Sequence, residues 1–130
     1  MSECLFCQII RKEVLSYKLY EDNKFLAFLD IFPKTTGHTL VIPKQHVAKV
    51  WDYPEIGEYF AIVAKIARHL KQVSNQEVRA LVYGFDIPHA HVHLLPGKTD
   101  SLNGPPAGEA GQKLSAVELK QVQAKFAVLQ

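Results

Sequence analysis

The chain lacks long apolar runs and carries little net charge. Its apolar runs fall far short of the roughly 18 residues that a membrane-spanning helix needs. The opening Met1-Ser-Glu-Cys4 has neither the basic nor the apolar region of a signal peptide. A formal net charge of +2 is too small to indicate a nucleic-acid-binding or membrane-binding surface. We therefore expect a cytoplasmic protein that binds neither membranes nor nucleic acids.

Cysteine is also scarce, and its placement is informative. The two cysteines, Cys4 and Cys7, lie in one Cys-Leu-Phe-Cys unit. A disulfide here would close only a tiny loop and add little stability, whereas two thiolates at this spacing suit a metal ion or a redox pair. The redox motif normally opens a helix that follows a strand, and only three residues precede Cys4. The pattern therefore favours a metal site.

Length and composition predict a single domain. Of the 130 residues, 48% are apolar and 22% are charged, which is ordinary for a globular protein large enough to bury a core. We expect residues 1–97 to form the core of the domain. Residues 98–130, where proline and glycine give way to a last periodic segment, are expected to form a linker and a C-terminal helix.

Hydrophobic periodicity predicts strands around one long helix. The expected elements are, in order, a short helix over residues 4–12, strands over 17–21, 24–29 and 38–43, a long helix ending near residue 73, and strands over 78–85 and 89–95. Strands and helices do not alternate strictly, so the class is α+β. We expect an antiparallel sheet of about five strands with one long packed helix, a short N-terminal helix and a C-terminal helical tail.

Local signals place the ends of the helices. Asp52 is a plausible N-cap of the long helix, with Pro54 in its first turn. Ser115 and Glu118 form the pattern of a capping box, which opens a terminal helix through about residue 128. The apolar stripe expected on that helix consists of Leu119, Val122, Phe126 and Leu129. The run over residues 78–85 is apolar enough for a strand buried on both faces.

Three of the six histidines lie in the stretch His89-Ala-His-Val-His-Leu-Leu95. Side chains alternate along a strand, so His89, His91 and His93 are expected on one face. The row could be a solvated face, although Thr, Lys or Glu would suit solvent better. It could be a zinc site, although no carboxylate follows at a short spacing. It could also hold a nucleophilic imidazole.

An imidazole suits attack on phosphorus. Its pKa near 6.5 keeps it largely neutral and nucleophilic at cell pH, while a neighbouring ring can still carry a proton. A phosphoryl group needs several hydrogen-bond donors around its oxygens, and His38, His91 and His93 could supply them.

The histidine stretch resembles the His-φ-His-φ-His-φ-φ motif, where φ is an apolar residue, of the histidine triad (HIT) family of nucleotide-binding proteins and hydrolases. Further segments resemble the blocks of that family in the same order, and together they cover residues 4–96. These segments are Phe6-Cys-Gln-Ile-Ile10, Tyr20-Glu-Asp22, Leu26-Ala-Phe-Leu-Asp-Ile31, and Gly37-His-Thr-Leu-Val-Ile-Pro-Lys44 with His46.

The resemblance implies a role for each histidine of the catalytic site. It makes His91 the nucleophile that attacks the α-phosphorus of a nucleotide and forms a transient nucleotidyl-histidine, which water then cleaves. His93 and His38 are implied to hydrogen-bond the phosphate and to help protonate the leaving group.

The resemblance also implies a nucleotide-binding pocket. Asp30 would accept from the ribose hydroxyls, and an acceptor-only carboxylate does suit a diol. The implied apolar walls around the base are Leu5, Phe6, Ile9, Phe28 and Ile31. Ordinary core packing explains Phe6, Phe28 and Ile31 equally well.

The metal site gains two ligands from the resemblance. Zinc-bearing members of the family, and the related hexose-phosphate uridylyltransferases, imply that His46 and His89 complete a tetrahedral site with Cys4 and Cys7. We expect a structural Zn²⁺ that clamps the N-terminal helix to the histidine strand.

One segment departs from the family pattern. Before the triad, Tyr83-Gly-Phe-Asp-Ile-Pro88 forms a shorter loop, and Asp86 stands near the position of a small hydroxyl residue. A carboxylate repels a phosphate unless its side chain turns away. Leaving-group preference and catalytic efficiency are therefore expected to differ from those of the family.

The sequence thus predicts a homodimeric HIT-type hydrolase. Its expected substrates are purine nucleoside monophosphates, AMP- or GMP-like, joined to a leaving group, with phosphoramidates first. Two alternatives stay open: a dinucleoside polyphosphate hydrolase, and a nearly inactive nucleotide-binding or interaction module.

Overall fold

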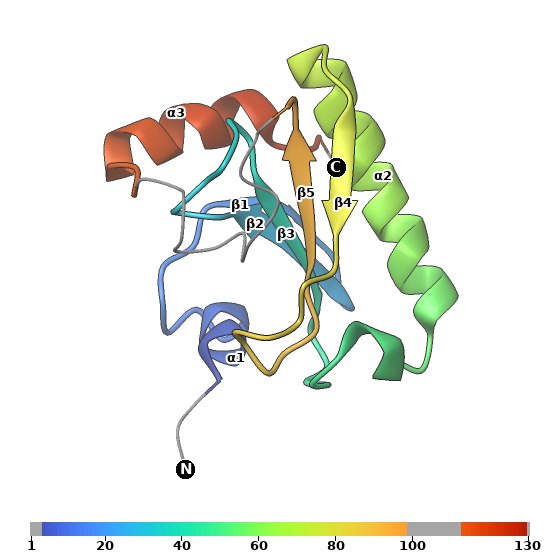
Figure 1. Cartoon of the computed structure of the whole chain (residues 1–130). Coiled ribbons are helices and arrows are strands. Elements are labelled where there is room, and N and C mark those ends of the chain that lie inside the picture. The colour runs from blue at the N-terminus through green and yellow to red at the C-terminus, as the bar shows by residue number, and fades with distance from the viewer. Residues whose placement is uncertain (1–3, 99–112, 130) are drawn as a thin grey trace.

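A five-stranded antiparallel sheet organises this protein, whose computed structural model describes residues 4–98 and 113–129 (Figure 1). The strands run in the spatial order β1-β2-β3-β5-β4. Their bounds are β1 Lys18–Glu21, β2 Phe25–Leu29, β3 Thr39–Pro43, β4 Val78–Leu81 and β5 Val92–Pro96. The helices are α1 Leu5–Ile10, a 3₁₀ turn η1 Val50–Asp52, the long α2 Ile56–Ser74 and α3 Ala116–Phe126. The predicted α+β class and its elements are confirmed.

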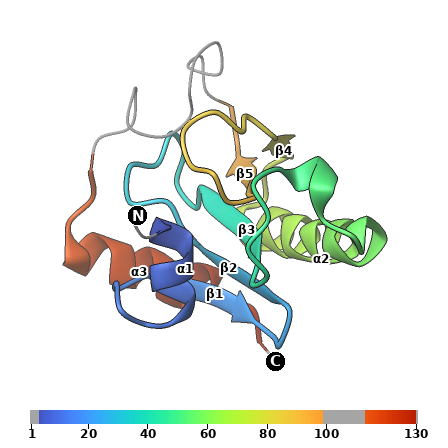
Figure 2. The same ribbon diagram turned by 90° about the horizontal axis from the view of Figure 1, so that it is seen from below.

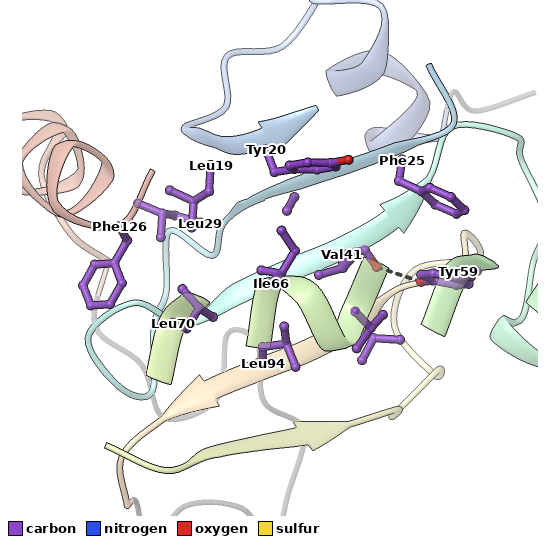
Figure 3. Packing of buried hydrophobic residues seen from close by; sticks show 14 of the residues in the cluster. Leu19, Tyr20, Phe25, Leu29, Val41, Tyr59, Ile66, Leu70, Leu94 and Phe126 are labelled. Carbon is purple, nitrogen blue, oxygen red and sulfur yellow. Dashed lines mark hydrogen bonds between the residues drawn. The ribbon is translucent and has the colours of Figure 1, made fainter. Parts of the chain in front are cut away.

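Strand alternation divides the core into two layers. On one face of the sheet, α2 and α3 cover a cluster that includes Val41, Val92 and Leu94. Figure 3 shows Ile66 and Leu70 of α2 directed at this cluster, with Phe126 of α3 beside it. On the other face, α1 packs against residues of opposite parity on β2 and β3, namely Leu26, Phe28, Leu40 and Ile42. Asp30 and His38 continue this second set along their strands, so they belong to the α1 face.

The long helix is fixed to the sheet by packing and by one buried hydrogen bond. Its apolar stripe, Tyr59, Val63, Ile66 and Leu70, is buried as its helical spacing predicts. The Tyr59 hydroxyl donates to the Val41 carbonyl at 2.7 Å, drawn as a dashed line in Figure 3. The helix ends at Asn75, which adopts the left-handed conformation common at helix C-termini.

Three predicted element boundaries are wrong. Helix α2 begins at Ile56 after Glu55, because Asp52 belongs to the preceding η1 turn and does not cap it. Strand β4 ends at Leu81 and is the outermost strand, so it is half-exposed and not buried on both faces.

The third wrong boundary lies in the histidine stretch, where regular pairing starts only at Val92. The Ala90 amide donates to the Val47 carbonyl, and the His89 amide donates to the Ile87 carbonyl. These two amides therefore take no part in the hydrogen bonds that pair β5 with its neighbouring strands. His89, His91 and His93 are nevertheless all buried, and Ala90, Val92 and Leu94 all pack into the α2 layer, so the predicted alternation holds.

The C-terminal helix joins the same core. Its predicted capping box is present, because Ser115 and Glu118 each accept from the backbone amide of the other. Leu119 and Phe126 are buried, while Leu129 is 95% exposed and does not belong to the apolar stripe. The His69 ring of α2 donates to the Phe126 carbonyl at 2.9 Å. Most of the predicted linker lies outside the described residues. Among the described residues, no helix combines the length and apolar character needed to span a bilayer.

Candidate active site and metal centre

Three separate segments meet at one end of the sheet. Helix α1, the β4–β5 connection and the segment between β3 and α2 lie together at the lower end of Figure 1, and Figure 2 shows them from below. They carry the N-terminal cysteines, the first triad histidines and His46 respectively. This meeting places the predicted metal ligands and the predicted nucleophile beside each other.

Hydrogen bonds define which nitrogen of His91 is free to react. Its Nδ1 lies 2.8 Å from the His89 carbonyl oxygen, which can only accept, so Nδ1 carries the proton. In the neutral ring, Nε2 therefore carries the lone pair. Burial lowers the pKa of His91, opposed by its bond to the His89 carbonyl and by the charge of Asp86. The ring is thus held neutral in one tautomer with a nucleophilic Nε2.

His38 and His93 form a chain of hydrogen bonds. The backbone amide of Lys34 donates to Nδ1 of His38 at 3.2 Å, so that ring is protonated on Nε2. Nε2 of His38 lies 3.0 Å from Nδ1 of His93 and donates to it. His93 must then carry its own proton on Nε2. Its ring lies beside that of His91, with the two centroids 5.0 Å apart.

This chain changes the role that the sequence predicts for His38. Both of its nitrogens are used within the protein and the ring is fully buried, so it acts through His93. Burial lowers the pKa of His38 to about 4 and that of His93 to about 2. Both rings are therefore neutral at cell pH, which suits hydrogen-bond donation to a phosphate better than proton transfer.

An apolar cavity of about 340 Å³ lies beside this cluster. All six residues expected to bind the nucleoside line it: Leu5, Phe6, Ile9, Phe28, Asp30 and Ile31. Phe6 and Phe28 meet edge to face with ring centroids 5.5 Å apart, and the Phe6 ring also lies 5.3 Å from that of His91. The cavity is thus separated from the triad by one aromatic ring.

Asp30 supplies the cavity with a buried acceptor. Its Oδ1 accepts from the Phe32 amide at 2.8 Å, whereas its buried Oδ2 has no hydrogen-bond partner within the described residues. Burial raises the pKa of Asp30 to about 6, partly opposed by the Phe32 amide. An unpaired buried carboxylate oxygen is costly and is relieved by a ligand hydroxyl that donates to it.

The four predicted metal ligands converge. Sγ of Cys4 and Nδ1 of His89 are 3.3 Å apart, and Sγ of Cys7 lies 3.3 Å from Nδ1 of His46. The two Nδ1 atoms are 3.2 Å apart, and Sγ of Cys7 lies 3.6 Å from Nδ1 of His89. A tetrahedral zinc ion with ordinary bond lengths keeps such atoms roughly 3.3 to 3.8 Å apart.

The tautomer of His89 also suits a metal. Its Nε2 lies 2.8 Å from the Pro43 carbonyl oxygen and donates to it, which leaves the Nδ1 lone pair directed at the cysteines. Two thiolates and two imidazoles are the donor set of closed structural zinc sites. The residues present therefore fit a structural zinc ion, which when bound would tie α1 to the carbonyl that orients His91.

The altered loop before the triad lies next to the reacting groups. Asp86 is exposed and lines the apolar cavity, and its charge raises the pKa of His91. A negative charge at this place opposes the approach of an anionic group.

Several residues of the site could not be named from the sequence motifs. The cavity is also lined by Val14, Leu15, Phe32, Leu40 and Ile87. Strand parity could have revealed Leu40, which pairs with Phe28 and shares its face. The other four belong to irregular segments, where no periodicity indicates which way a side chain points.

Comparison with known proteins identifies the class. Residues 11–100 match the family model of the HIT domain, and the chain belongs to the histidine triad family. It is 36% identical over 107 residues to the adenosine 5'-monophosphoramidase HNT1 of Saccharomyces cerevisiae, covering 78% of this chain and 66% of that protein.

Solved structures agree on the fold. A hypothetical histidine triad nucleotide-binding protein from Sulfolobus tokodaii superposes with a TM-score of 0.81 at 30% identity, covering 95% of this chain and 89% of the other. A Zn-bound histidine triad family protein from Mycobacterium smegmatis has a TM-score of 0.68 at 26% identity, with coverage of 95% and 93%.

Proposed function

We propose that this protein hydrolyses purine nucleoside monophosphates joined to an amine, through a nucleotidyl intermediate on His91. The proposal rests on one observation: an apolar cavity with a buried carboxylate lies next to a histidine that is held in one tautomer. Asp30 lines an apolar cavity, and its buried Oδ2 accepts no hydrogen bond among the described residues, although it lies 3.7 Å from Nε2 of His38. Phe6 of the same cavity lies 5.3 Å from the ring of His91, whose Nε2 lone pair is set by a backbone carbonyl. The similarity to a yeast adenosine 5'-monophosphoramidase supports the choice of substrate.

Binding follows from the shape and polarity of the cavity. The base lies between the aromatic and aliphatic walls, including Phe6 and Phe28, and the ribose hydroxyls donate to Asp30. The α-phosphate then reaches the histidines beyond Phe6. His93 donates from Nε2 to a phosphate oxygen, while His38 and the Lys34 amide hold His93 in that tautomer.

The reaction takes two displacements at phosphorus. The Nε2 lone pair of His91 forms a bond to phosphorus, and the bond from phosphorus to the leaving nitrogen breaks. The leaving nitrogen keeps the electron pair and takes up a proton from water. A second water then attacks phosphorus and gives its proton to the hydroxide that the first water became. The bond to Nε2 breaks with its pair returning to the ring, and the nucleoside monophosphate is released.

Charge favours an amine over a polyphosphate as the leaving group. The exposed carboxylate of Asp86 raises the pKa of His91 through its charge, and it repels a chain of further phosphates. This argues against the dinucleoside polyphosphate alternative.

Steady-state hydrolysis of adenosine 5'-phosphoramidate tests the proposal. We expect turnover by the wild type and its loss in His91→Ala, while AMP binding persists in both. His69→Gln alters the one histidine outside the site and is the matched control. A wild type that binds AMP without any turnover contradicts the hydrolase and supports a nucleotide-binding module.

We further propose a structural zinc ion on Cys4, Cys7, His46 and His89. The ligand spacing supports it, as does the zinc in the similar M. smegmatis protein. Elemental analysis of untagged protein should find close to one zinc per chain, and less than about half an equivalent counts against the site. Cys7→Ser should lose the ion, and wild-type protein treated with a strong chelator should melt at a lower temperature.

Self-association is the last part of the proposal. Ile56 and Phe60 on α2 are both more than one-third exposed, and β4 is an unpaired sheet edge among the described residues. We expect a homodimer through these elements, and sedimentation equilibrium measures it. Cytoplasmic location stays a prediction from the sequence.

A further inference from the structure

A second cavity borders the nucleophile. It has a volume of about 340 Å³ and lies on the other side of the β4–β5 connection from the nucleoside cavity. Asp86 and Ile87 of that connection face the nucleoside cavity, whereas Tyr83 and Phe85 line the second one. Its wall also includes His91 itself. One short loop therefore contributes to the walls of both cavities, and the wall of the second one includes the reacting histidine.

Large aromatic side chains stand exposed around this second cavity. Trp51 is 71% exposed and Phe85 is 81% exposed. Tyr83 meets Phe85 edge to face, with ring centroids 5.0 Å apart. Exposed aromatic surface that is gathered at a concave site is typical of a place where a planar group binds.

A single positive charge lies among these rings. The Lys49 ammonium donates to the Gly84 carbonyl and lies 6.0 Å from the centroid of the Phe85 ring. No carboxylate pairs with it in residues 4–98 and 113–129. Lys49 and His91 line the same cavity, so the ammonium lies close enough to act on a group bound to phosphorus there.

We infer that this cavity is the leaving-group subsite, and that it selects aromatic amines that carry an anionic substituent, such as an aromatic amino acid. The inference rests on the proposed function. The nucleoside occupies the first cavity and phosphorus lies at Nε2 of His91, so the remaining substituent must leave on a path that the first cavity does not fill. The rings of Trp51 and Phe85 stack on its planar part, and Lys49 pairs with its carboxylate.

The bond changes are those of the first displacement. The bond from phosphorus to the amine nitrogen breaks, and the nitrogen keeps the electron pair. Since the cavity is open to solvent at Trp51 and Phe85, water there supplies the proton that the departing amine needs. The amine then leaves by the same opening, while the nucleotide stays on His91.

Competition between four AMP amidates tests the subsite. The first carries no substituent on nitrogen, the second carries 2-phenylethylamine, the third carries phenylalanine, and the fourth carries 2-cyclohexylethylamine. We expect the wild type to favour the second over a cyclohexylethyl amidate by about 10-fold in kcat/KM, as stacking on aromatic rings predicts. The third should be favoured further, and Lys49→Ala should remove that last gain.

Variants at the rim give the decisive comparison. Trp51→Ala and Phe85→Ala should bring the aromatic-to-cyclohexyl ratio close to one. Val117→Ala removes an exposed apolar side chain on α3 outside both cavities and should leave the ratio unchanged. If the unsubstituted amidate is not hydrolysed by the wild type, the proposed function fails. If it is hydrolysed but the ratio is near one, the subsite fails alone.

A second copy of the chain is the competing occupant of this surface. If Trp51→Ala lowers the mass in sedimentation and leaves the aromatic ratio unchanged, the exposed rings belong to a subunit interface and the inference is overturned.

Discussion

Nε2 of His38 donates to Nδ1 of His93 across 3.0 Å, and both rings are essentially closed to solvent. The bond fixes the tautomer of His93 and leaves its Nε2 hydrogen for the substrate. In the proposed reaction, His38 is therefore a positioning residue, one step removed from phosphorus.

Replacing His38 should therefore slow the chemistry more than it weakens binding. We expect His38→Ala to lower kcat by about 10- to 100-fold, as for loss of a hydrogen-bond partner that orients a functional histidine. The KM should change little. His38→Gln, whose amide nitrogen can stand near Nε2, should lose less.

The pH profile separates this role from mere packing. The nearby His38 ring and burial both lower the pKa of His93. Removing His38 should raise that pKa, so the acid limb of the kcat profile should move to higher pH in His38→Ala and return in His38→Gln. An unchanged profile in His38→Ala contradicts the relay.

Asp86 should restrain the reaction. Its carboxylate lies near His91 and repels the phosphate, so Asp86→Asn should raise kcat/KM for AMP conjugates several-fold. The gain should shrink at high salt. Glu77→Gln removes the same charge from an exposed residue at the far end of β4 and should have no effect. Lower activity in Asp86→Asn would show that the carboxylate contributes to the chemistry.

We expect the buried carboxylate of Asp30 to lower the stability of the protein and to increase its affinity for the nucleoside. Its pKa is raised to about 6 by burial, from 3.8. Between these values the native state holds the proton more tightly than the unfolded state, so the group's contribution to stability falls as pH rises from about 4 to about 6. Asp30→Asn should therefore be more stable than the wild type at pH 7, by about 1 to 3 kcal/mol, and the gain should vanish near pH 4.

Ligand affinity should respond in the opposite sense. The ribose hydroxyls need the ionised carboxylate, so adenosine affinity should fall as pH drops through about 6 in the wild type. In Asp30→Asn the affinity should be weak at every pH. Adenosine is the appropriate ligand because it lacks the phosphate that titrates in the same range. Calorimetry across pH 5 to 8 measures both variants, and parallel curves would contradict the assignment.

The turn before His38 should depend on α3. Gly37 has φ +90°, and a Cβ atom there would lie 3.0 Å from Cζ of Phe126. We expect Gly37→Ala to cost about 1 to 2 kcal/mol from the left-handed backbone alone, and Phe126→Ala to cost about 3 to 5 kcal/mol. The double variant should cost less than the two added together, because removal of the ring makes room for the methyl group. Urea unfolding of all four proteins measures the coupling, and strict additivity would contradict the contact.

The sequence predicted what regular alternation and capping chemistry control. The parity of β2 and β3 places Asp30 and His38 on the histidine face, and the Ser115 capping box starts α3. Irregular backbone limited the rest. Pro88 offers no amide and the Ala90 amide bonds to Val47, so the strand that the histidine pattern predicts starts three residues late.

It was harder to predict which residues from distant parts of the sequence meet at the site. The spacing of Cys4 and Cys7 indicates a metal, but His46 and His89 came only from the family resemblance, because nothing local links segments so far apart. Trp51 carried no signal, since it lies in a non-periodic segment. Phe85 was wrongly predicted to lie in a buried strand, whereas β4 ends at Leu81 and Phe85 is exposed. Tertiary packing alone brings them to His91.

Trapping the nucleotidyl group on His91 tests the proposed intermediate directly. Wild-type protein is mixed with adenosine 5'-phosphoramidate labelled in the nucleotide, quenched within the first turnover under alkaline denaturing conditions, and digested for mass spectrometry. The account predicts one adenylyl group on His91, stable in alkali and lost in acid, and none in His91→Ala. Turnover by the wild type with no protein-bound adenylyl group, or the same label on His91→Ala, would contradict it.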